Sequence, residues 1–248
     1  MASNTETGHA KNVANFEDLI SFCAAYGATY NPTKAALKVG ALNTQLIAAN
    51  ATVQAVKTAK TAYDNATNAR EITFKPLKAL ATKVINAIAA TEATAQTVDD
   101  VKSSNNKIQG RRAKAIAKPD AKALAEGAEP VRTASTSQQS FDKLIDNFAQ
   151  LIATLTAEPK YLPNENELKL AALNALLADM KAKNSAVIAA NTVVSNARIA
   201  RDKALYDKTT GLVETALAVK VYVKSVYGAT SPQYKQIGGL KFVPISSR

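Results

Sequence analysis

Two of the side chains that most often carry chemistry occur once each in this chain, as His9 and Cys23. Zinc sites, haem sites and histidine-based acid–base pairs need more than one such group, so a single chain cannot assemble any of them. A lone cysteine also excludes an internal disulfide framework. We expect His9 to be a solvated residue of the N-terminal tail and Cys23 to be a buried thiol on an apolar helix face.

The carboxylates do not form a recognisable catalytic pattern either. Asp99 and Asp100 are adjacent and Glu165 and Glu167 are two apart, so neither pair shares a helix face. The glycines of the 237–239 stretch lack the Lys-Ser/Thr that completes a phosphate-binding loop. The sequence therefore predicts a protein that is not an enzyme, with no catalytic, cofactor-binding or metal-binding residues and no small-molecule substrate.

Arg70 and Arg201 form the most interesting polar pair. They occupy equivalent positions in a repeat described below, and each is followed by an acidic residue, Glu71 or Asp202. Both fall near the end of a long predicted helix, where a cation is favoured by the helix dipole. We expect a helix-capping or inter-helix salt-bridge role for both, in preference to a ligand-binding role.

A basic stretch in the middle of the chain is the strongest candidate for binding. From Lys102 to Arg132 the sequence holds eight basic residues and three acidic ones. A flexible cationic arm can contact phosphates without reading sequence, but this stretch has no aromatic residues for base stacking. A solvated spacer is the alternative interpretation. The residues that would contact nucleic acid are Lys107, Arg111, Arg112, Lys114, Lys118 and Lys122.

The composition predicts an all-α protein. Apolar residues make up 47% of the 248 residues, but aromatics make up only 6%, Trp is absent and much of the apolar count is Ala. Alanine favours helices and lets them pack closely, whereas β-sandwiches and barrels need more β-branched and aromatic residues. The net charge of +11 favours acidic partners without selecting one.

The chain repeats itself. When it is shifted by 131 positions, residues 30–70 match residues 161–201 at 17 of 41 positions without a gap. The matches include Tyr-Xaa-Pro, Ala-Leu-Asn and Ala-Arg, which helical composition alone does not explain. We therefore predict a tandem duplication of a three-helix unit that forms an elongated six-helix bundle.

Each copy of the repeat contains one long predicted helix. The first predicted helix of copy one runs from Asn15, as N-cap, to Tyr26, and the long helix follows the Tyr-Xaa-Pro turn and continues to about Arg70. Apolar residues along the long helix are spaced as in a coiled coil. A third helix begins at Pro76 in copy one and after a break at residues 207–211 in copy two.

The predicted boundaries divide the chain into five segments. They are a polar N-terminal tail (1–14), a first helical unit (15–110), a basic Ala/Lys/Pro linker (111–137), a second helical unit (138–239) and an apolar C-terminal tail (240–248). The tail is too short to be a domain, and we expect it to pack on the bundle or on a neighbouring subunit. Its candidate assembly residues are Leu240, Phe242, Val243 and Ile245.

Several stretches resemble uncharacterised helical proteins of Bacteroidota genomes. They are residues 8–16, the turn from Tyr26 to Pro32, residues 68–71 and residues 107–110. The resemblance covers most of the chain. It implies no activity, and no functional residue can be transferred from it.

These observations favour a non-catalytic structural or scaffolding protein that self-associates or binds protein partners through helical surfaces. The alternative is non-specific nucleic-acid binding through the basic linker and lysine-bearing helix faces. No signal peptide and no run of about 18 apolar residues is visible, so we expect a cytoplasmic protein without a transmembrane segment, and a leaderless export route stays open.

Overall fold

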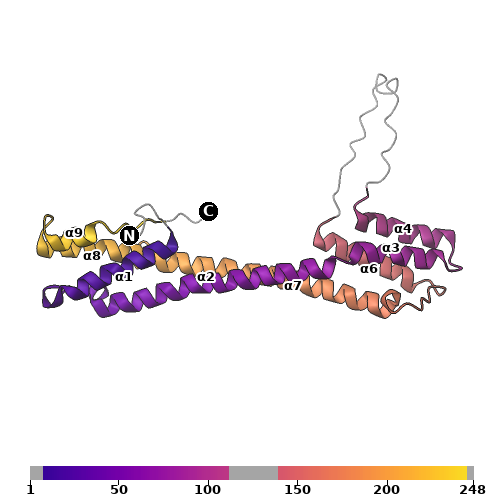
Figure 1. Cartoon of the computed structure of the whole chain (residues 1–248), viewed down its shortest axis with the longest axis horizontal. Coiled ribbons are helices and arrows are strands. Elements are labelled where there is room, and N and C mark those ends of the chain that lie inside the picture. The colour runs from indigo at the N-terminus through magenta and orange to yellow at the C-terminus, as the bar shows by residue number, and fades with distance from the viewer. Residues whose placement is uncertain (1–7, 112–138, 245–248) are drawn as a thin grey trace, which may run out of the picture. The chain divides into compact units, whose positions relative to one another are not determined.

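The computed structural model describes residues 8–111 and 139–244, and within these two ranges it is all-α, with no β-strand (Figure 1). The predicted fold class is confirmed at this level. Before the gap lie α1 (His9–Ala25), α2 (Val39–Phe74), α3 (Leu77–Ala89) and α4 (Ala95–Gln109). After it lie α6 (Phe141–Thr156), α7 (Leu170–Tyr206), α8 (Leu212–Tyr227) and α9 (Pro232–Gly238).

The chain folds into two compact units that do not follow the predicted repeat boundaries. Unit 1 combines Met1–Asp64 with Ala190–Arg248, and unit 2 is the continuous segment Asn65–Ala189. The division cuts through both long helices, α2 and α7. Each unit therefore combines the beginning of one predicted copy with the end of the other.

Unit 2 is built around α3, α4, α6 and the adjoining ends of the long helices. The helices α3 and α4 pack together, and α4 packs extensively on α6 (Figure 1). Apolar residues of α6 at helical spacing supply much of the core, with Phe148, Leu151 and Leu155 fully buried. The helix begins where the Ser140 hydroxyl accepts a hydrogen bond from the Lys143 amide, so Ser140 is its N-cap.

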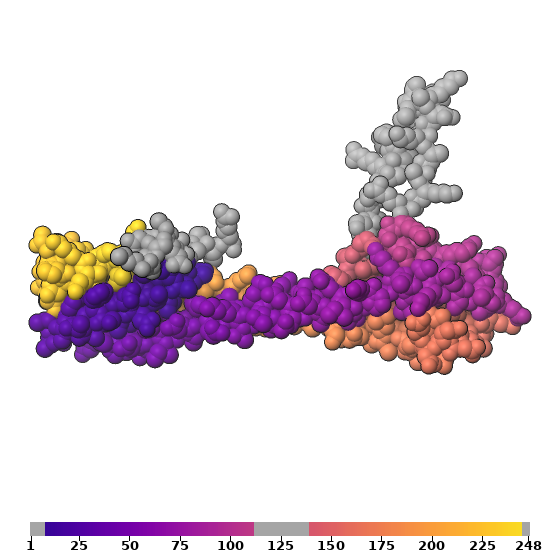
Figure 2. Space-filling view, in the orientation of Figure 1, coloured from indigo at the N-terminus to yellow at the C-terminus, as the bar shows by residue number. Residues whose placement is uncertain are grey.

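Unit 1 is built around α1, α8 and α9. In the space-filling view the α8–α9 segment, in yellow, lies against α1, in indigo (Figure 2). Phe16, Leu19 and Cys23 of α1 are buried with Val219 and Val223 of α8 in one apolar cluster. Burial raises the pKa of the Cys23 thiol to about 11, so the thiol stays protonated and unreactive near neutral pH, as the prediction of a buried thiol requires.

The Tyr-Xaa-Pro turn has the same geometry in both units. The buried Tyr30 hydroxyl donates a hydrogen bond of 2.7 Å to the Leu37 carbonyl, and the buried Tyr161 hydroxyl donates one of 2.8 Å to the Leu168 carbonyl. In both cases the accepting residue closes a short 3₁₀ turn, Ala35–Leu37 or Asn166–Leu168, directly before a long helix. Each tyrosine thus fixes the path by which the chain enters α2 or α7.

The breaks after the long helices have different causes. Between α2 and α3, Pro76 allows a bend but not a separation, so the two elements make one long bent helix. After α7, the Asp207 carboxylate accepts hydrogen bonds from the backbone and hydroxyl groups of Thr209 and Thr210, which hold its pKa well below the ordinary value. A Cβ at Gly211 would lie 2.5 Å from the Asp207 carbonyl oxygen, so this turn requires glycine.

Two parts of the helix prediction were wrong. The first helix begins at His9, not at Asn15, and Asn12 and Asn15 are buried within it. The helix α4 was missed because its inward face carries Ser104 and Asn105 beside only a few apolar residues. The first predicted unit therefore gains a fourth helix, α4.

None of the helices in residues 8–111 and 139–244 combines the length and the apolar character that crossing a membrane requires.

The paired turns lead to a first prediction. Removing the hydroxyl in Tyr30→Phe or Tyr161→Phe leaves a buried carbonyl without its donor, and we expect each variant to lose about 1 kcal/mol of unfolding free energy. Urea denaturation measures this loss. The control is Tyr234→Phe, at a half-buried ring of α9, for which we expect a change within about 0.5 kcal/mol. A loss at only one of the two turns would contradict their structural equivalence.

Candidate functional site

The C-terminal segment 240–244 is held against α1 by two buried asparagines. The Asn12 side-chain amide donates to the Val243 carbonyl at 2.8 Å and accepts from the Val243 amide at 3.1 Å. The Asn15 amide donates to the Lys241 carbonyl at 2.7 Å. Asn12 and Asn15 are almost fully buried, so their side-chain amides need partners inside the protein. These hydrogen bonds supply partners for the two amides and for the backbone of segment 240–244 together.

The candidate assembly residues are therefore already engaged within unit 1. Leu240 and Phe242 are half-buried and pack on its apolar cluster, whereas 39% of Val243 is exposed. The half-buried Lys220 ammonium donates to the Gly238 and Leu240 carbonyls and lies 5.4 Å from the centre of the Phe242 ring. Packing on the bundle was one of the two predicted positions for this tail. Ile245 lies outside the described residues.

The candidate nucleic-acid residues fall mostly outside the described part of the chain. Arg112, Lys114, Lys118 and Lys122 lie in the gap between residues 111 and 139. Lys107 is exposed in the last turn of α4, and Arg111 is exposed just beyond the left-handed Gly110 that ends this helix. The structure thus brings two of the six cations to one helix end.

Arg70 lies in a polar network that joins three helices of unit 2. Its guanidinium stacks on the Phe141 ring at 3.8 Å and donates to the Asn184 side-chain oxygen at 3.1 Å. The Asn184 amide in turn donates to the Asp142 carboxylate at 2.7 Å. Arg70 thus contacts other helices through an aromatic ring and an amide, and not through the inter-helix salt bridge that was one of its two predicted roles.

Arg201, the counterpart of Arg70, pairs with Asp202 at 2.7 Å on the same helix. Close to this pair, the His9 ring shares a 2.7 Å hydrogen bond with the Tyr206 hydroxyl, to which Asn12 also donates at 3.3 Å. Burial, with the Arg201 charge adding to it, lowers the pKa of His9. The prediction that His9 is a solvated tail residue was wrong, because His9 begins α1 and contacts α7.

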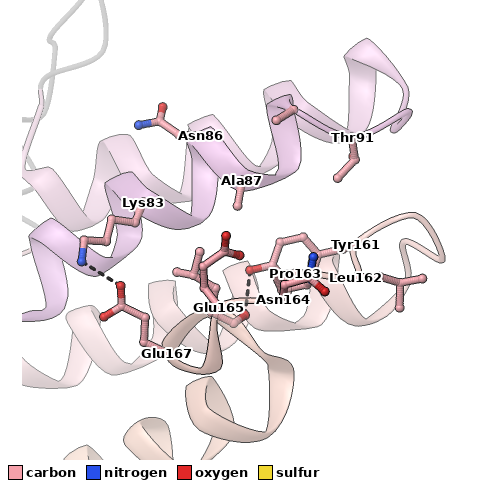
Figure 3. Close-up of a pocket in the computed structure, with 12 residues that line it drawn as sticks. Lys83, Asn86, Ala87, Thr91, Tyr161, Leu162, Pro163, Asn164, Glu165 and Glu167 are labelled. Atoms are coloured by element: carbon pink, nitrogen blue, oxygen red, sulfur yellow. Dashed lines mark hydrogen bonds and ion pairs between the residues drawn. The ribbon is translucent and has the colours of Figure 1, made fainter.

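A surface hollow of about 540 Å³ lies in unit 2 between α3 and the loop after α6 (Figure 3). The α3 side supplies Lys83 and Ala87, and the loop side supplies Tyr161 and Glu167. Lys83 and Glu167 form an ion pair of 2.8 Å across one end. Burial, with the nearby Glu165 carboxylate, raises the pKa of Tyr161 to about 12, so its hydroxyl stays a donor to Leu168.

A second surface feature is an uncharged face along α2. Ile47 and Ile72 are 70% and 71% exposed and lie 25 positions, or about seven turns, apart, so both fall on the same side of α2. A residue of an α-helix is rotated by about 100° from the one before it. On this basis, every exposed residue of α2 between Ile47 and Ile72 that lies within about 60° of the line joining them along the helix is uncharged. The residues of this face are Ile47, Asn50, Ala51, Gln54, Thr58, Thr61, Ala62, Asn65, Asn68 and Ile72.

The equivalent positions of α7 carry a shorter uncharged stretch, because the counterparts of Asn50 and Ile72 are the exposed Lys181 and Lys203. It ends at Ile199, which is 65% exposed, and consists otherwise of small uncharged residues that are all exposed. These residues are Ala178, Ala182, Ser185, Ala189, Thr192, Asn196 and Ile199. Both faces are present although one residue in five of this chain is charged, at 21% Asp, Glu, Lys and Arg.

The sequence signal for several of these residues was weak. Asn12 and Asn15 share a helix face with Phe16 and Leu19, so their burial could have been found from spacing, but not their partners on the C-terminal segment. Asn184 interrupts the apolar spacing of the second long helix, and that pattern gives no indication of its partners. Among the described residues, no group of three or more His, Cys, Asp or Glu side chains is arranged to hold a metal ion.

Comparison with known proteins supplies no relative. No protein-family model matches the chain, and no curated protein and no solved structure matches it either. The resemblance to helical proteins of Bacteroidota therefore stays a prediction, and the functional argument depends on the surfaces described above.

The environment of His9 leads to a second prediction. Since the folded chain has a His9 pKa below 6.5, the unfolded chain binds the proton more readily, and stability falls as the pH decreases through about 6.5. Urea unfolding at about pH 7.5 and about pH 5.5 measures this loss. His9→Gln cannot titrate and should lose less stability between the two pH values. Equal losses in both proteins would contradict the assigned pKa shift.

Proposed function

We propose that this chain is a non-catalytic scaffolding protein whose helical surfaces bind a second copy of itself or another protein. The observation that carries the proposal is the uncharged face of α2, some 38 Å long at 1.5 Å per residue, with an exposed isoleucine at each end. Burying such a face removes no charge from water, and each isoleucine contributes about 1.5–3 kcal/mol when it is covered.

We further infer that the chain arose by tandem duplication, which gives a scaffold two similar faces. The matching hydrogen bonds of Tyr30 and Tyr161 support this inference beyond the sequence matches. A protein with two like surfaces can contact two neighbours and so extend an assembly.

Light scattering on the eluting chromatographic peak tests the self-association arm of this proposal. We expect a mass at or above twice 26.2 kDa, retained in about 1 M salt because the α2 face is uncharged. The double variant Ile47→Lys and Ile72→Lys should weaken the assembly at least about tenfold, since two charges would have to be buried.

Ala48→Lys with Ala55→Lys is the matched control. Both alanines are exposed on α2 but lie about 80° to 100° away from the line of Ile47, so the control adds the same charge to the same helix. It should assemble as the unmodified protein does. A monomer at every concentration, or an equal effect of both double variants, would argue against assembly through the α2 face.

A second candidate function, binding of anionic polymers such as single-stranded nucleic acid, is favoured by the α8–α9 region of unit 1. From Thr215 to Pro244 the chain has four lysines and no Asp or Glu. The Lys224 ammonium lies 5.9 Å from the centre of the half-buried Tyr234 ring, so cation and aromatic surface occur together.

Fluorescence anisotropy with a labelled oligothymidine tests this candidate. Binding should weaken steeply as salt rises, and replacing Lys224, Lys235 and Lys241 by Ala should reduce both the affinity and its salt dependence. The control replaces the exposed Lys75, Lys78 and Lys181 of unit 2, which removes the same charge. Equal losses would mean that net charge, not the α8–α9 surface, binds the oligonucleotide.

A further inference from the structure

The hollow beside Tyr161 has a structural counterpart in unit 1. The helix α3 packs on the 3₁₀ turn Asn166–Leu168, as α8 packs on the turn Ala35–Leu37. The buried residues of the two helices correspond when α3 is shifted by 135 positions, which makes Ala87 the counterpart of Tyr222. The corresponding buried pairs are Leu77 and Leu212, Ala81 and Ala216, Val84 and Val219, and Ile88 and Val223.

In unit 1 the Tyr222 side chain fills the place that the hollow occupies in unit 2. Its ring meets the Tyr30 ring edge to face, with 5.3 Å between centroids and an interplanar angle of 86°. Its hydroxyl accepts a hydrogen bond of 3.2 Å from the Asn31 amide. In unit 2 the Ala87 methyl stands where this ring would begin, and the space beside Tyr161 is open.

The rim of the hollow is acidic. Lys83 is the one cation among its twelve lining residues, and it is paired with Glu167, so Glu165 adds a carboxylate that this pair does not neutralise. Leu162, which is 81% exposed, and Pro163 supply apolar surface on the loop side. An aromatic ring with a positive charge next to it is complementary to this arrangement.

We propose that the hollow between α3 and the 161–168 loop is a docking site for an aromatic side chain of a partner protein, with a Lys or Arg adjacent to it. Because the hollow is open along one side, it suits a ring presented by a larger surface better than a free small molecule, which would be enclosed on most sides (Figure 3). The inference rests on the proposed binding function, since a partner protein must present the ring.

Titrating the protein with a peptide and following its backbone amide chemical shifts tests whether the hollow binds an aromatic side chain next to a cation. The probe is the blocked tetrapeptide Gly-Tyr-Lys-Gly, and we expect saturable shifts at Leu162 and Glu165 with a dissociation constant on the order of 1 mM. The peptide with Ala for Tyr should give none. Replacing its Lys by Glu should weaken binding about threefold through the acidic rim. Free tyramine tests the small-molecule source, and saturable binding of tyramine without peptide binding would overturn the docking proposal.

Three variants test the position. Ala87→Tyr supplies the ring that unit 1 already has and should abolish the peptide-induced shifts without lowering the unfolding temperature. Ala89→Tyr, at an exposed site on α3 outside the hollow, should leave them unchanged. Tyr222→Ala should open a second site, where Lys34 stands in place of Glu165, so the peptide with Glu for Lys should add shifts at Tyr30 and Asn31. This variant keeps the test valid if Ala87→Tyr does not fold.

Peptide shifts that persist in folded Ala87→Tyr, or the absence of new shifts in Tyr222→Ala, would overturn the proposal. Its failure is distinguishable from failure of self-association. If the protein binds the peptide but is monomeric in light scattering, the docking proposal stands. Only self-association through the α2 face is then excluded.

Discussion

The length of the two long helices is the constraint on which the rest of the structure depends. At 36 and 37 residues, α2 and α7 are each about 55 Å long, more than one small helical core can cover. Each helix therefore contributes one end to unit 1 and the other to unit 2. The shorter helices and the 240–244 segment pack around these ends, and the tyrosine turns determine where each long helix starts.

Local chemistry made many of the helix boundaries predictable. Ser140 and Ser231 cap helices and Gly228 follows the last residue of α8, as their residue types indicate. Pro76 marks only the bend between α2 and α3, where a separate helix was predicted to begin. The helix α4 was not predicted, because the spacing of apolar residues cannot reveal a helix whose buried face includes Ser104 and Asn105. The first helix was started too late because Asn15 was read as its N-cap and residues 1–14 were read as a polar tail.

Tertiary relations were harder to predict than helix boundaries. Sequence similarity between two copies says which positions are alike, but not whether α3 packs on the turn of its own copy or of the other. The same holds for the sites. Arg70 was chosen from its position in the repeat, yet its partners Phe141 and Asn184 depend on how three helices meet. The hollow beside Tyr161 depends on the difference between Ala87 and Tyr222, which becomes visible only when the two units are compared.

The division of the chain also has a consequence for synthesis on the ribosome. Unit 2 is a continuous segment, so all of its helices leave the exit tunnel one after another and can pack as they emerge. Unit 1 needs α1 and the start of α2 together with α8 and α9, which are made almost two hundred residues later. During that interval the apolar face of α1, with Phe16 and Leu19, lacks its partners on α8 and α9. The first-made helix is therefore the last to be buried, and it is the natural point at which a chaperone would protect the nascent chain.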